Sequence, residues 1–67
     1  MTKQQTVSQQ IEFMIDGNSV KAVLEIIAEI CNSKAEHIQE AWQDKKLARA
    51  WRTVGGRIGM VAARSEV

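Results

Sequence analysis

Residues 20–42 read VKAVLEIIAEICNSKAEHIQEAW, and the spacing of their apolar side chains decides the fold class. The apolar positions recur at steps of four, three, four, four, three and four residues, at Val20, Leu24, Ile27, Cys31, Ala35, Ile38 and Trp42. This spacing matches the repeat of an α-helix, so we expect one helix of about 24 residues over 19–43. Residues 33–36 also fit a capping box, which leaves a break at Asn32–Ser33 open, although the apolar phase continues through it.

A second apolar stripe follows after Gln43 and Asp44, and it predicts another helix over 45–64. Its members recur at steps of four, three, four and three, at Leu47, Trp51, Val54, Ile58 and Val61. Asp44 is a suitable N-cap for this helix. Because short connections make consecutive helices antiparallel neighbours, residues 18–64 are expected to form a helical hairpin with the two stripes at its core.

Three glycines interrupt the second helix, in the stretch WRTVGGRIGMVAAR over residues 51–64. The glycine pattern lacks the Gly-Lys-Ser/Thr of a phosphate-binding loop and has no preceding strand. Placed on a helix, Ala48, Gly55, Gly59 and Ala62 instead line one narrow face of small residues, which lets a neighbouring backbone come close. A hinge at Gly55–Gly56 stays open as the alternative.

The N-terminal residues 1–17 are expected to form a short helix or arm. Val7, Ile11, Met14 and Ile15 have helical spacing, whereas Ile11, Phe13 and Ile15 alternate as in a strand. A helix is favoured because no second strand exists to pair with it. Gly17 is expected just beyond the end of this helix, with Asn18 or Ser19 capping the next one. Residues 65–67 are expected to be a tail.

A chain of 67 residues is one small domain that buries little surface alone, and its single cysteine rules out an internal disulfide. The long helix also carries extra apolar residues beside its main stripe. We therefore expect a homodimeric four-helix bundle rather than a compact three-helix monomer. The expected helix-packing or dimer interface comprises Val23, Ile26, Ile30, Trp51, Gly55, Ile58, Gly59 and Ala62.

No pattern in the sequence predicts catalysis, a cofactor or a metal. Cys31 lies on an apolar stripe, and His37 has neither a nucleophile nor a second histidine at a suitable spacing. Trp42 and Trp51 are expected to plug the end of the core rather than to line a ligand pocket. The sequence has no signal peptide and no membrane-spanning segment, so a cytoplasmic location is expected.

Charge is distributed unevenly along the chain. Residues 1–44 hold three lysines and seven acids, whereas residues 45–67 hold six cations and one acid. The sequence favours a non-enzymatic protein that self-associates and binds other proteins in an accessory, assembly or regulatory role. The alternative function is a nucleic-acid-associated dimer that uses the basic last helix, through Lys45, Lys46, Arg49, Arg52, Arg57 and Arg64.

Overall fold

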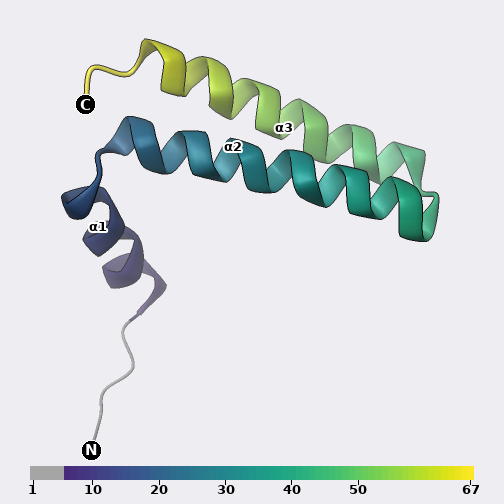
Figure 1. Ribbon diagram of the computed structural model, residues 1–67, viewed down its shortest axis with the longest axis horizontal. Helices are drawn as coiled ribbons and strands as arrows, with labels where there is room; N and C mark the ends of the chain where they lie inside the picture. Colours follow the sequence, from purple (N-terminus) through teal and green to yellow (C-terminus); the bar gives the residue numbers. More distant parts are fainter. Residues whose placement is uncertain (1–5) are drawn as a thin grey trace, which may run out of the picture.

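The computed structural model describes residues 6–67, so residues 1–5 of the arm expected over 1–17 lie outside it. The described chain forms α1 (Val7–Gly17), α2 (Val20–His37), the π-helical turn η1 (Ile38–Trp42) and α3 (Lys45–Arg64). No strand occurs in residues 6–67, which confirms the all-helical class and the helical N-terminal segment. Figure 1 shows α2 and α3 lying side by side in opposite directions, with α1 turned away from them.

The long helix runs without a break at Asn32–Ser33, as its apolar phase predicts. α2 passes directly into η1, and the helical path ends at Gln43, which adopts the left-handed conformation with φ 55° and ψ 28°. Asp44 then caps α3, because its carboxylate accepts a hydrogen bond from the backbone N–H of Leu47 at 3.0 Å. The tight connection and its cap are thus confirmed, while the widened last turn was not expected.

The junction between α1 and α2 differs from the expected one. Gly17 is the last residue of α1 rather than the residue beyond it, and Asn18 ends the helix with φ −128°. The side-chain amide of Asn18 donates to the carbonyl oxygen of Met14 at 2.9 Å, so a polar side chain satisfies a terminal carbonyl and no left-handed glycine is needed. Ser19 caps α2 as expected, since its hydroxyl accepts from the N–H of Ala22.

Small residues form the contact between α2 and α3. Ala48, Gly55 and Ala62, spaced by seven residues, are buried on α3, and Ala28, Cys31 and Ala35 are buried on α2. The expectation that the stripe of large residues on α3 faces α2 is therefore wrong for Leu47, Val54 and Val61, whereas Trp51 packs against the buried cluster that includes Ala35. Leu47, Val54 and Val61 are 38%, 48% and 59% exposed. The seven-residue repeat of alanine and glycine presents the flatter surface, so the backbones approach along it and the larger side chains lie beside the contact.

Among the glycines of α3, Gly55 lies closest to α2. A Cβ atom at this position would lie 3.0 Å from the Cβ of Cys31 and 3.3 Å from the backbone oxygen of Ala28. A Cβ at Gly59 would be 4.0 Å from the nearest atom, the Cβ of Ala28, and one at Gly56 would meet nothing within 4 Å. Close approach therefore requires glycine at Gly55 but not at Gly59, and the helix continues through Gly55–Gly56 without a hinge.

The far end of the hairpin is closed by the tail. The backbone oxygen of Val67 accepts hydrogen bonds from the N–H groups of Val20, at 2.9 Å, and Lys21, at 3.3 Å. These are two of the N–H groups that a helix N-terminus leaves without an internal partner. The three residues after α3 thus link its end to the start of α2.

The molecule is a single layer of helices. Its shortest dimension is 12 Å, which is about the diameter of one α-helix with its side chains. No large side chain within residues 6–67 is fully buried. Since stable domains pack at least two layers around a core, the described hairpin lacks the second layer that would cover its large apolar residues.

Replacing Gly55 by leucine should lower the free energy of unfolding by about 1–3 kcal/mol, because the added side chain pushes α2 and α3 apart. Gly56→Ala is the matched control. It adds a Cβ in open space and should raise stability by up to about 1 kcal/mol through helix propensity. Urea unfolding followed by circular dichroism, at one protein concentration, measures both. Equal effects of the two substitutions would show that the helices do not meet at Gly55.

Candidate interaction surface

The large apolar residues of α2 and α3 gather on one side of the layer. On α3 they lie within an arc of about 80° beside the small-residue contact, and on α2 within about 60°. Viewed from the N-terminus of each helix, both arcs are rotated from the small-residue contact in the same direction. Because the two helices are antiparallel, the arcs therefore lie on the same side of the layer. We call this surface the hairpin face; its members are Val20, Leu24, Ile27, Leu47, Trp51, Val54, Ile58 and Val61.

Members of the hairpin face are exposed or half-buried, and all are uncharged. Trp51 packs against the buried cluster of Ala35, Ile38 and Ala48, so the face is continuous with the core beneath it. The apolar spacing predicts these stripes inside the hairpin. The small-residue face of Ala48, Gly55 and Ala62, which the sequence also predicts as a surface of close approach, is the part of α3 that meets α2.

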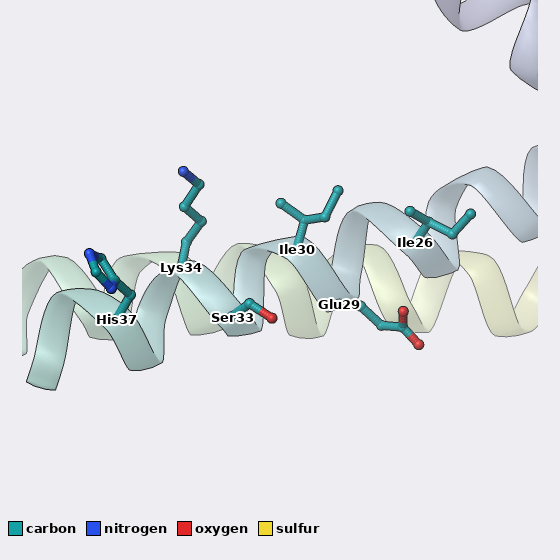
Figure 2. Close-up of a pocket in the computed structure, with 6 residues that line it drawn as sticks. All are labelled: Ile26, Glu29, Ile30, Ser33, Lys34 and His37. Carbon is teal, nitrogen blue, oxygen red and sulfur yellow. The ribbon is translucent and has the colours of Figure 1, made fainter.

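A second apolar surface lies on α2, on the side away from α3. Figure 2 shows Ile26 and Ile30 in line with Lys34 and His37, while Glu29 and Ser33 point to another side of the helix. Ile26 and Ile30 are each 50% exposed. We call this the outer strip. It is one helix wide and includes charged side chains, so it offers less continuous apolar area than the hairpin face.

The structure separates the eight expected interface residues into three groups. Val23, Gly55 and Ala62 are buried within the chain. Trp51, Ile58 and Gly59 are half-buried beside the contact of α2 and α3, and the first two belong to the hairpin face. Ile26 and Ile30 lie on the outer strip. The chain therefore does not bring all eight into one surface.

α1 has no buried residue. Its capping box is complete, because the Thr6 hydroxyl accepts from the N–H of Gln9 and the Gln9 side chain accepts from the N–H of Thr6. Val7, Ile11 and Met14 form an apolar stripe that is exposed, as is Phe13 on the other side. Local interactions rather than packing therefore hold this helix.

The two tryptophans occupy different environments, so the expectation that both plug the core is wrong for Trp42. Its side chain is 66% exposed at the end of η1. Trp51 is half-buried against the core cluster. The π-helical turn is wider than a regular turn, so its side chains point in other directions than the α-helical repeat predicts. Trp42 therefore does not continue the apolar stripe of α2.

Cys31 is buried between the helices, and His37 is exposed on the outer strip. Within residues 6–67, no group of three or more His, Cys, Asp or Glu side chains is placed to hold a metal ion. In the same residues, no helix is both long enough and apolar enough to cross a membrane. The shallow hollows of the surface lie along single helices, as Figure 2 illustrates.

All six cations of the alternative nucleic-acid surface are exposed on α3. They fall into two groups by position on the helix. Lys45, Arg49 and Arg52 lie on the side of the layer opposite the hairpin face, whereas Lys46, Arg57 and Arg64 lie within about 20° of one another on the side away from α2. The six cations therefore do not form one surface. Three lie on the side opposite the hairpin face, and three lie along the edge of α3 that points away from α2.

Comparison of the chain with protein-family models, curated proteins and solved structures gave no match. The functional conclusions consequently depend on the surfaces of the chain itself.

Trp51→Ala should lower the free energy of unfolding by at least about 1 kcal/mol, because it removes a large side chain from the core cluster. Trp42→Ala makes the same chemical change at an exposed site and should alter stability by less than about 0.5 kcal/mol. Chemical denaturation of the two variants measures the difference. A loss at Trp42 as large as that at Trp51 would place both side chains in the core after all.

Proposed function

We propose that this protein is a small non-enzymatic accessory, assembly or regulatory protein that acts through self-association and protein–protein contact. Its first partner is a second copy, bound hairpin face to hairpin face as a four-helix bundle. The single observation that carries the proposal is the exposed, uncharged hairpin face on a layer only 12 Å thick. A second copy supplies the missing layer.

The size of the hairpin face suits a specific dimer. α3 has 20 residues and is about 30 Å long, and two adjacent helices are about 20 Å wide. The whole side of the hairpin that carries this face therefore measures about 600 Å², and a pair of such sides removes about 1,200 Å² from solvent, above the roughly 1,000 Å² expected of a specific interface. The outer strip is half as wide and does not reach this area alone.

The composition of the hairpin face also favours pairing with itself. A two-fold dimer uses the same patch on both copies. A charged side chain near the two-fold axis would therefore lie next to the identical charge of the second copy. The members of the face are aliphatic side chains and Trp51, which pack together, and the charged Lys34, seven residues after Ile27, lies at its margin. Burying partly exposed Ile27, Leu47, Val54 and Val61 stabilises the dimer through the hydrophobic effect.

Val61→Lys should dissociate the dimer, because it places a charge within the proposed interface, where burial of an unpaired charge is costly. Met60→Lys is the matched control. Val61 and Met60 are adjacent on α3 and are 59% and 60% exposed, respectively. Met60 points away from the hairpin face. Sedimentation equilibrium in the micromolar range should give twice the 7.5 kDa chain mass for the wild type and Met60→Lys, and the single-chain mass for Val61→Lys.

Two outcomes of this experiment contradict the proposal. A wild-type mass of one chain would favour the compact three-helix monomer. A dimer that survives Val61→Lys but is lost in Ile30→Lys would place the interface on the outer strip. Circular dichroism of each variant verifies that the helices remain, which is expected because the substituted side chains are already half exposed or more.

A further inference from the structure

We infer that the edge of α3 formed by Lys46, Arg57 and Arg64 binds the phosphate backbone of duplex nucleic acid without sequence specificity. This basic edge is a binding surface in addition to the hairpin face. A second copy seated on the hairpin face covers a neighbouring arc of α3 and leaves these cations at the rim. The inference therefore stands or falls separately from the dimer.

The first observation is the complete separation of charge on α3. Six of the nine lysines and arginines in the sequence lie within residues 45–64, and none of the eight acids does. A solvated helix is usually stabilised by mixed charges at i, i+4 spacing, which α3 does not have. Its positive potential is therefore not neutralised from within the helix.

The second observation is the geometry that sets the basic edge apart from the other cations. Lys45, Arg49 and Arg52 share a side of the layer with the glutamates of α2, namely Glu25, Glu29 and Glu36, which reduce the potential there. Lys46, Arg57 and Arg64 instead lie opposite Gly55 on the helix, and Gly55 faces α2. They point away from α2, so the acids of α2 screen Arg57 and Arg64 less than they screen Arg49 and Arg52, while Lys46 shares a shallow hollow with Asp44.

The third observation is the position of Lys46 in the first turn of α3, beside Lys45. That turn has no acidic residue. Cations near a helix N-terminus oppose the helix dipole, at a cost of about 0.3–1 kcal/mol each. Asp44 at the N-cap offsets part of this cost, and an external anion that meets the two lysines offsets it further.

The spacing of the basic edge fits a duplex. Arg57 and Arg64 are about 10 Å apart along the axis, and Lys46 is about 16 Å from Arg57, on a straight helix. The first distance is close to the width of about 12 Å of the major groove of DNA, so the two arginines reach phosphates on its two walls. The intervening residues on the edge, Ala50, Thr53 and Met60, include no long amide or acidic side chain to read bases, so the contact is to the backbone.

Fluorescence anisotropy with a labelled 24-base-pair DNA duplex of mixed sequence tests the inference. Three phosphate contacts per chain predict a slope of about −2.7 for log affinity against log salt, which is about a 40-fold loss between 50 and 200 mM NaCl. The double variant Arg57→Gln/Arg64→Gln should reduce this slope by about two units and weaken binding at 50 mM at least about tenfold.

Lys21→Gln/Lys34→Gln is the matched control, because both double variants lower the net charge of the chain from +1 to −1. The control removes its charges from α2 and should bind within about twofold of the wild type. Absence of duplex binding at 50 mM NaCl overturns the inference, and so does equal weakening of both variants, which would indicate net charge alone. Binding to polyglutamate as tight as to the duplex, with the same dependence on Arg57 and Arg64, would assign the edge to acidic proteins instead.

Discussion

The close approach of α2 and α3 at Gly55 is the constraint on which the rest of the structure depends. A Cβ at that position would lie 3.0 Å from the Cβ of Cys31, so the two backbones meet with almost no side chain between them. Ala48 and Ala62, seven residues to either side, are fully buried on the same line. Because the line of contact through Gly55 uses mainly small residues, it removes little apolar area from water, and most of the larger side chains of α3 lie beside it on the hairpin face.

Local features of the fold could be predicted from the sequence because they depend on neighbouring residues. The helical path through Asn32–Ser33, the cap at Asp44 and the helical character of Val7–Gly17 all follow from spacing and capping chemistry. Gly17 was misplaced because Asn18 provides its own hydrogen bond to Met14, an interaction that glycine-based rules do not include. The exposed position of Trp42 was not predicted, because the π-helical turn η1 departs from the regular α-helical repeat on which the prediction depends.

The face of α3 that packs against α2 could not be predicted in the same way. α3 carries two stripes of equal regularity, a small one through Gly55 and a large one through Val54 and Ile58, and periodicity alone does not say which of them meets α2. The usual preference for burying large residues selected the wrong one. Of the residues expected in a helix-packing or dimer interface, Gly55 and Ala62 lie in the packing of α3 against α2, whereas Ile26 and Ile30 lie on the outer strip. The cations of α3 are exposed.

Small residues rather than large ones lie between α2 and α3, and this leaves large apolar side chains exposed on the hairpin face. Had Leu47, Val54 and Val61 packed between the helices, the hairpin would have buried its own apolar area and presented a polar surface. Instead the small contact forms a flat layer, and Trp51 lies between the core cluster and the hairpin face. In the proposed dimer, the second copy would cover Trp51 as well as the hairpin face, so stability and association would be coupled. The cations of the basic edge lie outside that proposed interface.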